Sequence, residues 1–180
     1  ESLDDLAKIY KIPASLEELK KVHAEYSNYS YKGRALSQSM MALDTETNTK
    51  YPWKKGAKII MVSAAVDVKN AAAMFLEHRD SPYDWREALP YILGITMSPH
   101  PKAWWNWKFD FSMFKYALMP KVQSLCESDS YRNNLENIVG ASLEDILKVS
   151  GVNNTRWDGL MGEHMVDEDK KGFNGLKSVI

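Results

Sequence analysis

Two patterns of apolar and polar positions recur along the chain. Apolar residues at helical spacing predict helices, and short apolar runs predict strands. Residues 3–26 carry apolar side chains at helical spacing, interrupted by Pro13 and resumed behind Ser15, which opens a capping box. A polar connector, residues 27–38, follows. Short apolar runs bounded by turn residues then predict strands at 40–43, 57–66, 70–76 and 103–106. Longer periodic stretches predict helices at 84–93, 110–118, 142–149 and 158–166, and the start of another at 175–180.

The connections between these elements complete the predicted architecture. Asp67-Val68-Lys69 is short enough to join two antiparallel strands as a hairpin. Pro120 is expected to stop the helix before it, and residues 120–141 are polar and predict irregular structure. Strands interleaved with helices indicate an α/β layered domain.

Composition narrows the class of protein. With 180 residues, 44% hydrophobic and 26% charged, the chain has the size and balance of one compact globular domain. No apolar run is long enough to cross a membrane and no secretory signal opens the chain, so we expect no membrane partner. The single cysteine, Cys126, suits a reducing, cytoplasmic compartment. A net charge of −1 disfavours a protein that holds nucleic acid by positive charge alone.

Acidic residues at strand ends are the most informative chemical feature. Asp44 and Glu46 are two positions apart, so on a strand both carboxylates point to the same side. Asp110 opens a helix behind a later strand, and the three acids converge if the two strands are neighbours. Carboxylate oxygens are the ligands that Mg²⁺ and Mn²⁺ prefer, and two such ions would relieve the repulsion between the acids. On spacing alone, a solvated turn or a helix cap is the commoner explanation of such a pair.

Two motifs resemble those of a known nuclease family. Ala42-Leu43-Asp44-Thr45-Glu46-Thr47 resembles the first motif of the DEDD (DnaQ-like) 3′→5′ exonucleases, and Asn106-Trp107-Lys108-Phe109-Asp110 resembles the second. The later stretch from Trp157 to Glu168, followed by Gly175-Leu176-Lys177, is similar to the proofreading domains of family A, bacteriophage-like DNA polymerases. The resemblance runs from about Met40 to Ile180. It implies an RNase H-like mixed β-sheet flanked by helices, residues 39–180, with a short helical N-terminal extension, residues 1–38.

The resemblance also implies roles for individual residues. Asp44 would bridge two divalent cations, Glu46 would hold the one that carries the attacking water, and Asp110 would ligate the second. Thr47 and Asn106 would position the terminal nucleotide. The third motif of the family, a Tyr or His and a final Asp on a helix beyond the Leu-Lys pair, has no counterpart before Ile180. We expect it beyond that residue or from another chain.

The predicted function is metal-dependent removal of nucleotides from single-stranded or frayed DNA 3′ ends. It would serve proofreading beside a polymerase domain, in the same or another chain, in the cytoplasm of a bacterial or phage-infected cell. One alternative is a catalytically incomplete nuclease fold that acts as a scaffold or interaction module. A second is an exonuclease on RNA, like the RNase D group.

Other conspicuous residues favour structural explanations. The histidines are expected at the surface, in loops or, for His164, in a core or cap position. The cluster Trp104, Trp105 and Trp107 could stack on bases, but packing is favoured. Lys54 and Lys55 could contact phosphates near the acids, although a solvated turn is the simpler explanation.

Overall fold

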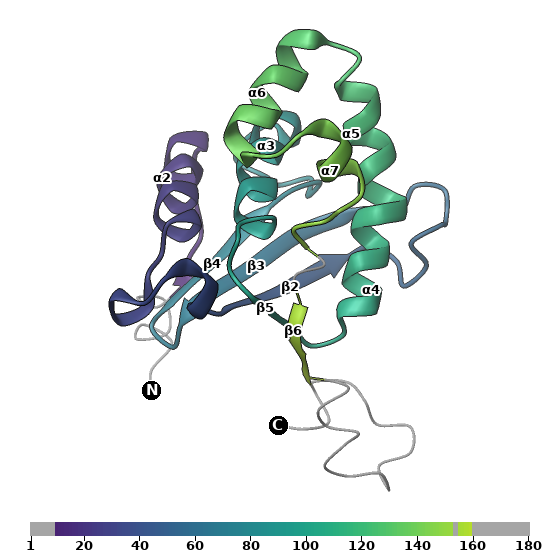
Figure 1. The fold of residues 1–180 in the computed structure, drawn as a ribbon. Coiled ribbons are helices and arrows are strands. Elements are labelled where there is room, and N and C mark those ends of the chain that lie inside the picture. Colours follow the sequence, from purple (N-terminus) through teal and green to yellow (C-terminus); the bar gives the residue numbers. More distant parts are fainter. Residues whose placement is uncertain (1–9, 153–154, 160–180) are drawn as a thin grey trace, which may run out of the picture.

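A six-stranded sheet organises the computed structural model, which describes residues 10–152 and 155–159 (Figure 1). The strands lie in the order β1-β4-β3-β2-β5-β6. Their bounds are β1 Tyr10–Lys11, β2 Met41–Thr47, β3 Ile59–Asp67, β4 Asn70–Phe75, β5 Lys102–Trp104 and β6 Thr155–Asp158.

The sheet is mixed, as the sequence predicts. β2, β3 and β4 are successive antiparallel neighbours, with β3 and β4 joined by the short turn at 68–69. β5 lies parallel to β2, and β6 lies parallel to β5. The predicted RNase H-like sheet flanked by helices is therefore confirmed. β1, from the N-terminal part of the chain, adds an edge strand parallel to β4.

Helices connect and cover the sheet. The described helices and helical turns are η1 Tyr31–Gly33, η2 Leu36–Gln38, α2 Leu16–Ser27, α3 Trp85–Thr96, α4 Trp107–Ser112, η3 Met113–Leu118, α5 Met119–Leu125, α6 Asp129–Val139 and α7 Leu143–Leu147. The side chains of Ser15, Asp84, Ser128 and Ser142 each accept a hydrogen bond from a backbone N–H in the first turn of the helix that follows.

Side-chain alternation gives the sheet two different faces. Along β2, Met41, Leu43 and Thr45 are buried, whereas Ala42, Asp44 and Glu46 are exposed. The described helices gather on the side of the buried set (Figure 1). The opposite face, which we call the open face, carries small residues from three strands and is covered by no helix of the described part of the chain.

Proline is compatible with the helices at both places where it occurs. Pro90 lies inside α3 and cannot donate to the carbonyl of Arg86, and the Tyr131 hydroxyl of α6 donates to that oxygen at 2.8 Å instead. Pro120 does not stop the preceding helix: the chain runs from α4 through the wider π-helical turns of η3 into α5, and Pro120 lies in the first turn of α5.

Several predicted elements differ from the structure. The helix beginning at Trp107 continues through η3 into α5, and most of the stretch 120–141, expected to be irregular, forms α5 and α6. Both helices bury one apolar stripe, which their high polar content hides in the sequence. Asp158 ends strand β6, and Gly159, the last described residue, is helical, so the helix predicted from 158 starts one residue later. The rest of the predicted helices at 158–166 and 175–180, with His164, and the first part of the predicted N-terminal helix lie outside the described residues.

A buried polar network lies beside the junction of β2 and β5. Lys102 is fully buried, and its ammonium group donates to the Ser98 carbonyl at 2.8 Å and to the Ser98 hydroxyl at 2.9 Å. His100, predicted to lie at the surface or in a loop, is also fully buried, with Nδ1 3.0 Å from the Ser98 hydroxyl. Burial lowers the pKa of Lys102 to about 7, and burial also lowers the pKa of His100.

This network predicts a pH-dependent stability. Between about pH 7 and the ordinary lysine pKa of 10.5, the unfolded chain holds a proton on Lys102 that the folded chain has released. Stability contributed by this residue therefore rises with pH across that window. Lys102→Met should remove the rise and increase the free energy of unfolding at pH 7 by about 1–3 kcal/mol. Urea unfolding at several pH values measures both, with exposed Lys69→Met as the control. Parallel pH profiles for wild type and Lys102→Met would contradict this account.

Candidate active site

The two acids of β2 lie next to each other on the open face. Asp44 and Glu46 are exposed and separated by the buried Thr45. Partial loss of water, and then the charge of Glu46, raise the pKa of the Asp44 carboxyl, while a hydrogen bond with the Thr45 backbone opposes the rise. Because Asp44 keeps solvent-exposed surface, water screens part of this effect.

Asp110 approaches β2 from the helix layer. It lies in the first turn of α4, after Asn106 at the N-cap, and only 2% of the residue is exposed. The Thr45 hydroxyl donates to its carboxylate at 2.5 Å. Burial raises the pKa of Asp110 to about 7; the hydrogen bond from Thr45 opposes this rise and the charge of Asp44 adds to it.

The separation of two parallel strands makes room for this contact. β2 and β5 are paired only at Met41–Lys102 and Ala42–Ala103. After Trp104 the chain leaves the sheet and enters α4, whereas β2 continues as far as Thr47. Asp110 thus comes beside the part of β2 that β5 no longer borders. In open α/β sheets, ligand sites form where neighbouring strands diverge in this way.

The three predicted acids are linked in pairs. The charge of Glu46 acts on Asp44, and the charge of Asp44 acts on Asp110, but in the described part of the chain no three acidic, histidine or cysteine side chains form a group that could hold a metal ion. Carboxylates are the ligands that hard divalent cations prefer. A bound cation would also stabilise the ionised form of these carboxylates, which burial and mutual repulsion disfavour. Asp44 and Glu46 lie on the open face and Asp110 lies on the helix side with Thr45, so the described structure does not gather the three predicted acids into one metal-binding group.

The residues expected at the substrate border the acids. Thr47 ends β2, and its hydroxyl donates to the Thr49 carbonyl at 2.9 Å. Asn106 is half-buried, and its side chain makes no hydrogen bond that caps α4. Phe109, the residue before Asp110, is half-buried against the core. Trp104 is buried with its ring edge against Phe114, which agrees with the packing role expected of it.

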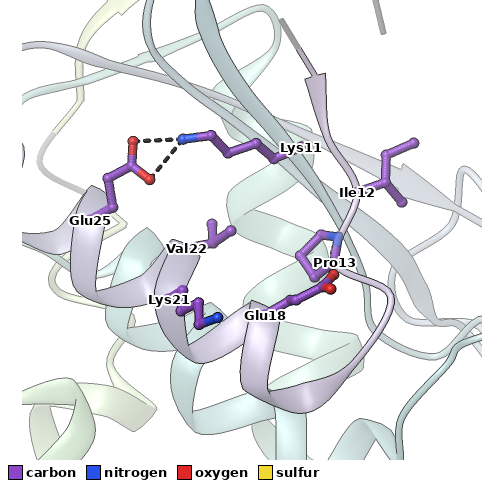
Figure 2. A pocket seen from close by; sticks show the side chains of 7 residues that line it. All are labelled: Lys11, Ile12, Pro13, Glu18, Lys21, Val22 and Glu25. Carbon is purple, nitrogen blue, oxygen red and sulfur yellow. Dashed lines mark hydrogen bonds and ion pairs between the residues drawn. The ribbon is translucent and has the colours of Figure 1, made fainter. Parts of the chain in front are cut away.

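Two pockets differ in their relation to the acids. A shallow hollow of about 190 Å³ on the open face includes Asp44 and is otherwise lined mainly by small residues of β2, β3 and β4. A pocket of about 330 Å³ lies between β1 and α2, where Lys11 bridges both carboxylate oxygens of Glu25 at its rim (Figure 2). Strands β4 and β3 separate β1 from β2, so this second pocket does not belong to the candidate site.

Thr45 is the site residue that the sequence analysis missed. It lies between two acids, and strand alternation turns it to the opposite face of the sheet. A hydrogen-bonding threonine between two acids, on the opposite face of the strand, is the sequence feature that could have indicated its contact with Asp110.

Removing the buried charge at Asp110 should stabilise the fold. Between an unfolded-state pKa near 3.8 and the folded-state pKa of about 7, the folded chain holds a proton that the unfolded chain releases, so stability falls as pH rises. Asp110→Asn keeps an acceptor for Thr45 and should raise the free energy of unfolding at pH 8 by about 1–4 kcal/mol. Denaturant titrations in EDTA test this, with the exposed Asp80→Asn as control. A loss of stability specific to Asp110→Asn would contradict the assignment of its burial cost.

Comparison with known proteins gives similarity to solved structures. No protein-family model matches the sequence, and no curated protein matches it. Among solved structures, the chain is similar to the EXO domain of Nibbler from Aedes aegypti, with 15% identity and a TM-score of 0.40. The match covers 61% of this chain and 44% of that one, so the chain spans less than half of its length. At this degree of similarity, no catalytic residue or substrate is carried over.

Proposed function

We propose that the chain is the metal-binding core of a 3′→5′ exonuclease that acts on single-stranded or frayed DNA ends. The observation that carries the proposal is the approach of Asp110 to Thr45, which brings an acid from α4 within electrostatic reach of Asp44. These are the acids of two motifs that resemble the DEDD exonucleases in the same order. The RNase H-like sheet is compatible with this assignment.

Each residue has a chemical role in this proposal. Asp44, Glu46 and Asp110 would hold two divalent cations, Mg²⁺ or Mn²⁺. When bound, such ions supply an activated water and offset charge on the leaving oxygen of a phosphodiester. Thr45 is a positioning residue, because its hydroxyl fixes the carboxylate of Asp110. Thr47 and Asn106 would contact the terminal nucleotide from either side of the acids.

The biological setting is proofreading. A mispaired 3′ end frays and costs little to unpair, so a single-strand site removes errors preferentially. A polymerase domain in the same or another chain would present that end. We place the activity in the cytoplasm of a bacterial or phage-infected cell; no helix among the described residues is long and apolar enough to cross a membrane.

A scaffold function is the second candidate, and one observation favours it. The acids of the described residues form no group of three that could hold a metal ion. A nuclease fold with this incomplete set would bind nucleic acid or protein without hydrolysis. The third acidic motif of the family decides between the candidates, because its Asp would add the ligand that the described residues lack.

Digestion of a 5′-labelled oligonucleotide tests the enzyme directly. We expect Mg²⁺- or Mn²⁺-dependent shortening from the 3′ end that EDTA abolishes. Asp44→Asn should reduce the rate more than about 100-fold, because loss of even an outer partner of a metal ligand costs about 10- to 100-fold. Exposed Asp80→Asn is the matched control. Digestion that persists in Asp44→Asn would reject the site, and no digestion by a chain extended past Ile180 would favour the scaffold.

Matched DNA and RNA strands of one sequence test the substrate class. We expect the DNA strand to be shortened at least about 10-fold faster under single-turnover conditions, a difference of about 1.4 kcal/mol in transition-state stabilisation. The comparison uses the same chain, metal concentration and label. Faster digestion of RNA would place the enzyme with the RNase D-like alternative.

A further inference from the structure

The loop between β2 and β3 combines exposed aromatic rings with positive charge. This loop, residues 48–58, contains Lys50, Lys54, Lys55 and Lys58 and no acidic residue, in a chain whose net charge is −1. All four lysines are exposed, and within the described part of the chain none of them forms an ion pair. The loop is therefore a concentrated positive patch on a nearly neutral protein.

Two aromatic side chains project from the same loop. Trp53 is 73% exposed and Tyr51 is 46% exposed. Their ring centroids are 6.0 Å apart, and the ammonium group of Lys50 lies 5.5 Å from the centre of the Tyr51 ring. Two exposed aromatic rings side by side, unlike a single exposed ring, offer adjoining apolar faces to a ligand.

The backbone of the loop is held in place despite these exposed side chains. The Asn48 side chain donates to the Gly56 carbonyl at 2.9 Å and accepts from the Lys58 N–H at 2.8 Å. The backbone N–H of Tyr51 donates to the Thr49 hydroxyl at 3.2 Å. Gly56 has a φ of +81°, a value that favours glycine. A preorganised loop loses little conformational entropy when a ligand binds.

The loop begins one residue after Thr47, at the end of the strand that carries Asp44 and Glu46 (Figure 1). Cationic side chains beside an acidic strand end suit a ligand whose charge is negative and extended, since the carboxylates repel it unless cations intervene. Stacking faces and lysines together suit a polymer that alternates flat bases with phosphates. An acidic polypeptide would use the lysines but would leave Trp53 without a flat partner.

We propose that residues 48–58 form a binding platform for single-stranded nucleic acid. Trp53 and Tyr51 stack on unpaired bases, and Lys50, Lys54, Lys55 and Lys58 contact the adjacent phosphates. This inference deepens the proposed function, on which it rests for the nature of the strand, by assigning the segment of the strand next to the terminal nucleotide.

Binding without hydrolysis tests the platform. The full chain is titrated against a fluorescein-labelled oligothymidine in EDTA, and binding is followed by fluorescence anisotropy. Trp53→Ala should weaken binding about 5- to 100-fold, and Trp53→Phe, which keeps a flat ring, should fall between it and wild type. The matched control is Tyr116→Ala, another half-exposed ring with a lysine beside it, at Lys115; its affinity should be unchanged.

The lysines are tested by the salt dependence of binding. Replacing two phosphate contacts, in Lys54→Gln with Lys55→Gln, should lower the slope of log Kd against log salt by about 1.4, while Lys115→Gln leaves the slope unchanged. Competition with polyglutamate distinguishes the class of ligand. Equal loss of polyglutamate and oligonucleotide binding in Trp53→Ala would overturn the proposal in favour of an acidic protein partner.

The outcome is separable from that of the nuclease assay. Asp44→Asn should bind the oligonucleotide in EDTA at least as tightly as wild type, because it removes a negative charge near the phosphates. If the chain binds through the loop, and a chain extended past Ile180 still does not digest DNA in Mg²⁺, the platform stands and the enzyme assignment fails. If Trp53→Ala and the double lysine variant both bind as wild type, the platform is wrong whatever the nuclease assay shows.

Discussion

The hydrogen bond from Thr45 to Asp110 is the contact on which the candidate site depends. It joins the central strand to a helix 65 residues further along the chain, where β5 has stopped bordering β2. Side chains alternate along the seven-residue strand β2, so Asp44 and Glu46 face solvent while Thr45 faces the helix layer. The Thr45 hydroxyl can therefore donate a hydrogen bond to Asp110 on that side. The uncharged side chain of Thr45 thus connects the strand that carries two acids to the helix that carries the third.

The position of Asp110 disfavours the negative charge of its own carboxylate. Burial, more than the neighbouring carboxylate, raises the pKa of Asp110, and the pKa of Asp44 rises for the same two reasons. A hydroxyl donor reduces this cost but cannot neutralise it, whereas a cation can. The same fold contains the opposite case in Lys102, a buried amine whose hydrogen-bond partner among the described residues is Ser98. Stability and the capacity to bind a cation are therefore in conflict at Asp110, as is common at functional sites.

The sequence predicted the sheet better than the helices, for a physical reason. Strands such as 57–66 are short apolar runs with clear ends, and their order follows from the chain. Helices α5 and α6 bury only narrow apolar stripes, and a helix tolerates Pro120 at its position. For both reasons the polar composition of residues 120–141 predicted irregular structure where helices form. Asp44, Glu46 and Asp110 were recognisable as motif residues, and their pairwise proximity needed coordinates. The burial of His100 and Lys102 could not be predicted from the sequence, because a polar side chain is fully buried only where the tertiary structure supplies hydrogen-bond partners.

The alternation along β2 also determines how this segment can change during evolution. Adding or removing one residue between Met41 and Asp44 would turn both acids to the face that carries the buried apolar residues of β2, because side chains alternate along a strand. Substitutions that keep the length are tolerated far more readily than insertions or deletions there. The irregular pairing between Glu46 and Thr47 marks where this restriction ends, since a strand whose register already shifts can absorb a further residue. Relatives of this chain should accordingly vary in length after Thr47 and keep a constant length before it.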